Sequence, residues 1–370
     1  MIVPERLDKF EARVTREVDE GLLPACQWAF GLNGEIVASG VAGSADEDTR
    51  FTIFSATKAL VASTVWTCIA EGSIKIDSRV ADMIPEFATN GKENITIEQV
   101  MLHTSGFPRN GWDLDMKTSE GRRARFANWK TNWEPGTRYE YHATTAHWVL
   151  VELLEVATGK NYLEVIEERV TTPLGLPRIL GIPTSDSTNI AALEHVGEPI
   201  SPDELEKLLG IREMPVTEVT PEALMALDQP ERRALGVPGG GGVTTARNYA
   251  LFYQGMLHND KGIWDEGVLR DATSNVRNSF GDPLFNTPAN RGLGVVIAGD
   301  DGKASMRGFG KTQSPKTFGH NGAGGQIAWV DPESGLSFVY LTNGLDRHMI
   351  REARRGVALS SIAAEVTQPL

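Results

Sequence analysis

The segment from Ser55 to Glu71 constrains the fold more than any other part of the sequence. It is almost uncharged and apolar on all sides of a helix, and it ends at Gly72. A helix without a polar face must be covered by other parts of the protein on every side. We therefore expect a buried helix in a chain that can enclose it. The chain has 370 residues, 41% of them hydrophobic, which is enough for a core of this kind.

Both ends of the chain carry short apolar runs that are typical of strands. Ala25–Leu32 and Glu35–Gly40 are joined by Asn33-Gly34, a dipeptide that favours a type I′ turn, so we expect a hairpin here. Arg50–Phe54 is a further candidate strand. Near the other end, four more are expected, at Leu293–Ala298, Ala304–Arg307, Gln326–Val330 and Leu336–Leu341.

The middle of the chain is mostly helical from about Val80 to Gly262. The expected helices include Thr144–Gly159, Asn161–Val170 and Thr244–His258, and two more lie near the N-terminus and over Arg347–Val366. This order predicts an α+β fold with a largely antiparallel sheet from both chain ends and a helical insertion. We expect residues 1–75 and 290–370 to form the sheet region, residues 76–289 the helical region, and the active site to lie between them.

Composition excludes several classes of function. The formal net charge of −13 makes nucleic acids and anionic membrane surfaces poor partners. Cys26 and Cys68 are too few for a disulfide framework and are expected to be buried free thiols. No run approaches the ~20 apolar residues of a membrane span, and the N-terminus lacks the pattern of a signal peptide. The expected compartment is the cytoplasm.

Ser55-Ala56-Thr57-Lys58 could carry nucleophilic chemistry. Side chains at positions i and i+3 share one face of a helix, so the Lys58 amine could serve as base for the Ser55 hydroxyl. Ser55 would lie at a helix N-terminus, where its free N–H favours negative charge. Burial would lower the pKa of the lysine toward the neutral form that a base needs. Alternatively, Ser55 is an ordinary helix cap and Lys58 reaches solvent.

Two further segments could complete such a site. Tyr141 lies in a short extended piece before a helix and could relay a proton, although a packing role is the common one for tyrosine. His320-Asn321-Gly322-Ala323 precedes a strand. Small residues there would allow a substrate close to the backbone, and the Ala323 N–H could complete an oxyanion hole. The alternative is a simple strand-entry turn.

Taken together, these segments resemble the superfamily of serine β-lactamases, penicillin-binding proteins and family VIII carboxylesterases. Met101–Gly106 and the glycine-rich turn Pro238–Gly242 resemble two further landmarks of that superfamily. The resemblance implies that Ser55 is acylated and that Lys58 and Tyr141 share the proton transfers. It also implies that the N–H groups of Ser55 and Ala323 hold the oxyanion and that His320, Asn321 and Gly322 line the substrate. No metal or cofactor is expected.

Two departures from the superfamily pattern affect the expected substrate. Position 143 is alanine where β-lactamases and penicillin-binding proteins usually have asparagine, and position 320 is histidine where β-lactamases usually have lysine. An unperturbed histidine is mostly neutral at pH 7. Both changes weaken recognition of an anionic β-lactam, so we expect hydrolysis of small, less charged esters.

Other functions remain as alternatives. The same machinery could serve a β-lactamase, a D-aminopeptidase, another amidase or an acyltransferase, and the chain could also be a non-catalytic binding or assembly protein. Gly-x-Ser-x-Gly and His-Glu-x-x-His are absent. His142 and His147 are poorly spaced for metal binding and His103 is expected to be a buried hydrogen-bonding residue. The glycine-rich turn lacks the end of a phosphate-binding loop. Trp112, Trp129 and Trp133 are more typical of core packing than of a pocket.

Overall fold

Strands from both ends of the chain form one antiparallel six-stranded sheet, which confirms the prediction. The computed structural model describes residues 1–214, 218–284 and 286–367. In it the strand order is β2-β1-β11-β10-β9-β8. The strands are β1 (Ala25–Leu32), β2 (Glu35–Gly43), β8 (Val296–Ile297), β9 (Phe318–Gly319), β10 (Ile327–Asp331) and β11 (Leu336–Thr342). The α+β, β-lactamase-like class expected from the sequence therefore describes the fold.

The predicted hairpin joins β1 and β2. Asn33 and Gly34 have φ angles of 55° and 82°, the positive values that a type I′ turn requires. The pairing then runs from Leu32 opposite Glu35 to Ala25 opposite Gly43, with a bulge between Phe30 and Gly31. Local turn chemistry therefore sets the register of this edge of the sheet.

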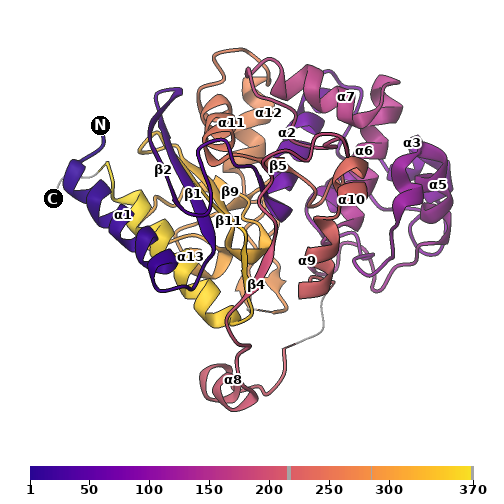
Figure 1. The fold of residues 1–370 in the computed structure, drawn as a ribbon. Helices are drawn as coiled ribbons and strands as arrows, with labels where there is room; N and C mark the ends of the chain where they lie inside the picture. Colours follow the sequence, from indigo (N-terminus) through magenta and orange to yellow (C-terminus); the bar gives the residue numbers. More distant parts are fainter. Residues whose placement is uncertain (215–217, 285, 368–370) are drawn as a thin grey trace.

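Helices cover both faces of the sheet (Figure 1). On one face, α1 (Pro4–Asp19) and α13 (Met349–Ala364) pack on a cluster that includes Trp28 and Phe30. On the other face, α11 (Ala246–His258) packs on β1 and β11, and Ala29 belongs to the larger core there. Because both faces are covered, β1 is buried at all eight positions and reads as a continuous apolar run.

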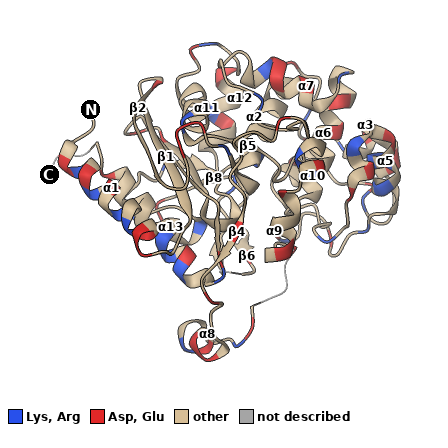
Figure 2. Ribbon diagram, in the orientation of Figure 1, with Lys and Arg blue, Asp and Glu red and all other residues tan. Residues whose placement is uncertain are grey.

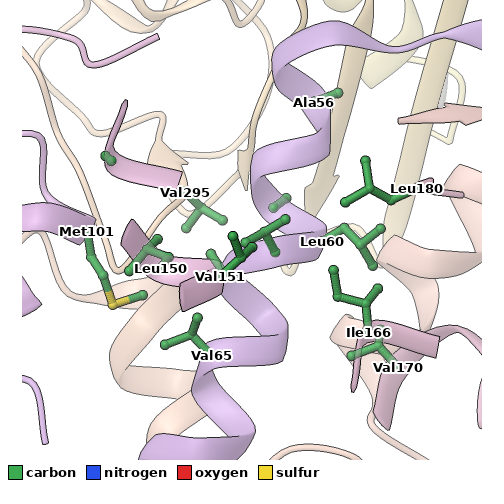
Figure 3. Close-up of a cluster of buried hydrophobic side chains, with 14 of the residues drawn as sticks. Ala56, Leu60, Val65, Met101, Leu150, Val151, Ile166, Val170, Leu180 and Val295 are labelled. Carbon is green, nitrogen blue, oxygen red and sulfur yellow. The ribbon is translucent and has the colours of Figure 1, made fainter. Parts of the chain in front are cut away.

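The helix expected at Ser55–Glu71 is α2 (Thr57–Ala70), and it is buried from Thr57 to Cys68. Figure 3 shows side chains of α2, among them Leu60 and Val65, packed among apolar side chains from other segments, including Leu150 and Val151. The other α-helices are α3 (Val80–Met83), α4 (Ile97–Met101), α5 (Ser119–Asn128), α6 (Thr145–Thr158), α7 (Tyr162–Ile166), α8 (Pro202–Leu209), α9 (Pro221–Leu227), α10 (Pro230–Leu235) and α12 (Glu266–Ser274). The division into two regions at residues 75 and 290 stays a prediction.

Short strand pairs connect the helical middle to the rest. β4 (Glu194–Val196) runs parallel to β12 (Gly344–Asp346), and β3 (Phe51–Thr52) pairs antiparallel with β5 (Val243–Thr244). A further pair consists of β6 (Gly281–Asp282) and β7 (Thr287–Pro288). The pairing of β3 with β5 brings the glycine-rich turn next to Ser55.

One predicted strand is wrong. Ala304–Arg307 is a turn of 3-10 helix that ends at Gly308, which has a φ of 90°. The Arg307 side chain donates to the carbonyls of Pro288 and Ala298 and fixes this turn. Four residues with apolar alternation do not distinguish a strand from a single helical turn. The expected strand Leu293–Ala298 is also shortened to Val296–Ile297, because the chain turns back at Gly294.

Charged residues lie mainly on the outer helices. Figure 2 shows red and blue segments along α1, α13 and α5, whereas the middle of the molecule is largely tan. Cys26 and Cys68 are free and buried, as predicted. In the part of the chain that the structure describes, no helix is long and apolar enough to cross a membrane.

Candidate active site

Ser55 lies in a tight turn between a short strand and the buried helix. The turn is the 3-10 helix Phe54–Ala56, which follows β3 and leads into α2. Ser55 is half-buried, whereas every other residue from Phe51 to Val61 is buried. Phe54 has a φ of 44°, a left-handed conformation that costs an aromatic residue ~1–2 kcal/mol. The surrounding contacts must therefore hold this turn in place.

The glycine-rich turn supplies those contacts. The Ile53 N–H donates to the Gly242 carbonyl at 2.9 Å, and the Gly242 N–H donates to the Thr57 hydroxyl at 2.9 Å. The Thr57 hydroxyl in turn donates to the Phe54 carbonyl at 2.6 Å. A Cβ on Gly242 would lie 2.6 Å from Thr57 Oγ1, so no larger residue fits. The sequence predicts Pro238–Gly242 as a glycine-rich turn, and the structure shows that this turn also holds the segment around Ser55 in place.

Lys58 is fully buried on the first turn of α2, beside Ser55. Its Nζ lies 3.2 Å from Ser55 Oγ, 2.7 Å from the Ala143 carbonyl oxygen and 2.6 Å from the Gly239 carbonyl oxygen. Among the described residues, no carboxylate forms an ion pair with it. The two carbonyls come from segments about 85 and 180 residues farther along the chain.

The surroundings of Lys58 favour the neutral amine. Burial lowers its pKa well below the usual value, the positive charge of Arg291 lowers it further, and Glu218 acts in the opposite direction. A neutral amine has two N–H donors and one lone pair. The carbonyls of Ala143 and Gly239 occupy the two donors, so the lone pair is directed at the Ser55 hydroxyl. This arrangement suits a base.

The Tyr141 ring packs against the Lys58 amine, with 4.9 Å between Nζ and the ring centre. Its hydroxyl is buried and makes no hydrogen bond of ordinary geometry within the described residues, although it is close enough to Ser55 for that hydroxyl to lower its pKa. Burial is the larger effect and raises the pKa of the phenol, while the charge of Arg291 lowers it. The structure thus brings Ser55, Lys58 and Tyr141 together.

The His320–Ala323 segment lies on the other side of Ser55. A Cβ on Gly322 would be 2.2 Å from the Ile53 carbonyl oxygen, and one on Gly324 would be 3.6 Å from the Phe54 ring. Ala323, between these two glycines, is therefore placed beside the Ser55 turn. Glycine at these positions permits the close approach.

His320 is buried, with its ring centre 6.0 Å from that of Tyr141. Burial, then Arg291 and Lys58, lower the pKa of its imidazole well below the usual value, so the ring is neutral at pH 7. The Asn321 carboxamide donates to the Gly308 carbonyl and accepts from the Ala328 N–H, so the backbone already occupies it. Substrate contacts of His320, Asn321 and Gly322 stay predictions.

Three further histidines, His103, His142 and His147, lie near one another in the interior. The His142 N–H donates to His103 Nδ1 at 3.1 Å, which confirms His103 as a buried hydrogen-bonding residue. His142 and His147 are buried as well. Among the described residues no group of three or more His, Cys, Asp or Glu is placed to hold a metal ion. Trp129 is a core residue, whereas Trp112 is partly buried against the core.

Three contributors to the site were missed in the sequence. The carbonyls of Ala143 and Gly239 are backbone groups, and no pattern of side chains predicts which carbonyl will accept a hydrogen bond from Lys58. The run of glycines at Pro238–Gly242 was the one indication that this turn could approach another segment closely. Arg291 is the third: its guanidinium lies 5.4 Å from the centre of the Tyr141 ring. Arg291 directly precedes Gly292 and belongs to none of the motifs in the sequence, so the residues around it do not indicate a role in the site.

Comparison with known proteins agrees with this geometry. The Beta-lactamase family matches residues 10–361. The esterase/beta-lactamase LipL of Mycobacterium tuberculosis (strain ATCC 25618 / H37Rv) is 28% identical over 349 residues, which cover 86% of this chain and 76% of LipL. The esterase EstB of Burkholderia gladioli is 28% identical over 341 residues, covering 84% of this chain and 83% of EstB.

The crystal structure of a penicillin-binding protein homolog from Caulobacter crescentus has the same fold, with a TM-score of 0.77 and 24% identity over 98% of both chains. The family match spans nearly the whole chain, and it includes each of the segments that meet at Ser55. The chain therefore belongs to the Beta-lactamase family and is a serine hydrolase of that family.

Proposed function

We propose that the protein is a carboxylesterase that forms an acyl-enzyme on Ser55. The observation that carries this proposal is the environment of Lys58, whose two N–H donors are taken by carbonyls while Ser55 Oγ lies 3.2 Å away. A serine hydroxyl needs a base at this distance to become a nucleophile. A buried lysine without an acidic partner is suited to that role at neutral pH.

In the acylation step, the Ser55 hydroxyl gives its proton to the Lys58 amine while Oγ bonds to the ester carbonyl carbon. The electron pair of the carbonyl moves to its oxygen, and the N–H groups of Ser55 and Ala323 stabilise the resulting oxyanion. When the intermediate collapses, the bond to the alcohol oxygen breaks. That oxygen takes the proton from Lys58 by way of the Tyr141 hydroxyl.

Deacylation follows the same path in reverse. A water molecule gives a proton to the pair formed by Tyr141 and Lys58 and adds to the acyl carbon. The second oxyanion occupies the same two N–H groups, and its collapse releases the acid while Ser55 Oγ recovers a proton. The buried Tyr141 hydroxyl has no hydrogen-bond partner among the residues that the structure describes, so it can take up and release a proton in both steps.

The preference for esters rests on positions 143 and 320. Ala143 offers only its carbonyl, which accepts from Lys58, so no side-chain amide is available at this position to hold a substrate. His320 is neutral, so it offers no charge for a carboxylate. Two relatives with 28% identity carry the word esterase in their names, which supports the same choice.

Amide substrates remain the second candidate. The name of LipL combines esterase with beta-lactamase, and the proposed acylation step applies equally to a β-lactam or a D-amino-acid amide. A family member without turnover is the third possibility. The proposal of a working enzyme is supported against it by Ser55, Lys58 and Tyr141, which are all present and in contact.

The test is turnover of p-nitrophenyl esters of increasing chain length, beside nitrocefin and a D-amino-acid p-nitroanilide. We expect the short esters to turn over fastest, with a burst of nitrophenol. Ser55→Ala should reduce kcat by about 10⁴-fold or more, because it removes the nucleophile. Ser63→Ala is the matched control, since Ser63 is a buried serine on the same helix whose hydroxyl donates to the Leu60 carbonyl.

Each outcome decides between the candidates. Ester turnover that is lost in Ser55→Ala and kept in Ser63→Ala supports the proposal. Faster turnover of nitrocefin or the anilide would replace the ester with an amide. Equal activity of wild type and Ser55→Ala would refute the role of Ser55, and no reaction of Ser55 with a fluorophosphonate would favour the non-catalytic alternative.

A further inference from the structure

Three arginine residues are buried in the described part of the chain, and one of them has no acidic partner. Arg122 forms ion pairs with Glu152 and Glu155. Arg355 does so with Glu17 and Asp346. The third, Arg291, is 7% exposed and pairs with no carboxylate among the described residues. An unpaired cation is unfavourable at a buried position, so a functional reason for its retention has to be considered.

The backbone holds Arg291 in a fixed place between β7 and β8. Its N–H donates to the Asn278 carbonyl at 3.0 Å, and its own carbonyl accepts from the Arg277 N–H at 2.8 Å. The Asn278 side chain in turn donates to the Leu102 carbonyl at 3.1 Å. The position of the guanidinium is therefore tied to segments on two sides.

The Arg291 side chain packs against two tyrosines of the extended segment before α6, Tyr139 and Tyr141. The guanidinium carbon is 5.6 Å from the ring centre of Tyr139 and 5.4 Å from that of Tyr141, and Nη2 donates to the Tyr139 hydroxyl at 2.9 Å. Both distances are typical of a cation packed on an aromatic ring. Nε and Nη1 are buried and have no hydrogen-bond partner in the described residues.

Lys58 packs on the same Tyr141 ring, with Nζ 4.9 Å from the ring centre. Since both distances end at one ring centre, the guanidinium and the amine are at most about 10 Å apart. Both side chains are shielded from solvent, so little water or salt screens their mutual repulsion. A proton on Lys58 would thus face a second positive charge across the tyrosine.

We propose that Arg291 is a positioning residue of the hydrolase, which holds the Tyr141 ring and whose unpaired charge favours the uncharged amine of Lys58. This inference rests on the proposed function, in which Lys58 must be neutral to accept the Ser55 proton. Arg291 touches neither the nucleophile nor the expected position of the oxyanion. It acts through the two residues that do the proton transfer.

The directions of the pKa shifts agree with this geometry. After burial itself, Arg291 is the largest cause that lowers the pKa of Lys58, and it also lowers that of Tyr141. Glu218 is the carboxylate that acts on Lys58 in the opposite sense. The other titratable groups near Lys58, Tyr141 and Arg291 include Tyr139, whose pKa is raised by burial and further by the charge of Asp282, and four histidines, His103, His142, His147 and His320. Burial lowers the pKa of each of these histidines, so they add no charge at neutral pH.

The experiment is the rate at which a fluorophosphonate labels Ser55, measured from about pH 5 to pH 10. In Arg291→Met, which keeps an unbranched apolar stem, we expect the acid limb of the profile to move up by about one pH unit. The rate below the limb falls about tenfold and recovers above it. Arg270→Met removes an exposed charge and should leave the limb unmoved. Thermal unfolding shows which variants are folded.

Each result bears on the inference. A folded Arg291→Met with an unmoved limb, or with an equal loss at every pH, would overturn it, because a merely structural role predicts those results. If Arg291→Met does not fold, Arg291→Gln serves in its place, and an unmoved limb in a folded Arg291→Gln overturns the inference. If wild type is not labelled at any pH, it is the proposed function that fails instead.

Discussion

Two buried charged clusters of this protein differ in how their charges are compensated. Between α5 and α6, Arg122 Nε donates to Glu152 at 2.7 Å, and Glu152 also accepts from Ser119 and Arg123, both at 2.6 Å. At the active site, Lys58 contacts a hydroxyl and two carbonyls, and Arg291 contacts a phenol. The first cluster pairs opposite charges, whereas the second places two basic side chains near each other, and no carboxylate of the described residues is within hydrogen-bond reach of either.

The ion-paired cluster is suited to stabilising the fold, whereas the unpaired lysine is suited to proton transfer. A paired charge keeps its ionised form and fixes two helices to each other, so its removal leaves an uncompensated carboxylate. An unpaired buried lysine instead gives up its proton, and its neutral amine can then accept one from a nearby hydroxyl. Variants of the two clusters should therefore fail in different ways.

The largest expected effect is on catalysis. Lys58→Met should lower kcat/KM for a p-nitrophenyl ester by about 10³- to 10⁴-fold, because the base for Ser55 is lost. Its free energy of unfolding should change by less than about 2 kcal/mol, since relief of lysine burial opposes the loss of two hydrogen bonds to carbonyls. Steady-state kinetics and urea unfolding measure the two quantities. A large loss of stability would place Lys58 in the same class as Arg122.

The next effect concerns stability alone. Arg122→Met should lower the free energy of unfolding by about 3–5 kcal/mol, because Glu152 stays fully buried without its main partner. The activity of the folded fraction should be unchanged. Arg125→Met is the matched control on the same helix: its ion pair with Asp115 is partly exposed, so the cost should stay below about 1 kcal/mol. Similar losses in both variants would contradict the role of burial.

The smallest effect depends on pH. Burial raises the pKa of Glu352 on α13 to about 7 from an ordinary value of 4.5. Between these values the folded protein binds a proton that the unfolded chain does not, so this contribution to stability is present below about pH 4.5 and is lost as the pH rises to about 7. Glu352→Gln should therefore raise the stability at pH 8 by about 1 kcal/mol, after solvent screening of this half-buried group, and leave it unchanged near pH 4.5.

Urea unfolding at the two pH values measures this difference. An equal gain at both would mean that Glu352→Gln acts through packing rather than through protonation. Glu352 lies close to Gly325, whose backbone N–H lowers its pKa, and near Arg355. Glu352→Gln therefore tests whether burial shifts the pKa of a carboxylate next to the ion-paired Arg355 toward its neutral form, as it shifts the pKa of the unpaired Lys58 amine at the active site.

Much of the fold followed from local patterns. Asn33-Gly34 identified the hairpin, whose second strand runs three residues beyond the predicted Gly40, and the uncharged run after Ser55 identified the helix at the centre of the core. Ala304–Arg307 failed because its pattern was too short and because Arg307 contacts carbonyls that are distant in the sequence. The hairpin and the long uncharged helix were predicted well, because a turn dipeptide between two strands and a pattern over several helical turns discriminate between structures better than four residues do.

The sequence by itself determined that Ser55 and Lys58 meet, because a separation of three residues on a helix places them on one face. It also favoured burial of Lys58, because the helix around it has no polar side, but it left open that the lysine reaches solvent. Only the tertiary structure decided the protonation of this pair. The carbonyls of Ala143 and Gly239 and the charge of Arg291 reach Lys58 from three distant segments. Electrostatic effects depend on distance in space, and a pattern of neighbouring residues does not contain that distance.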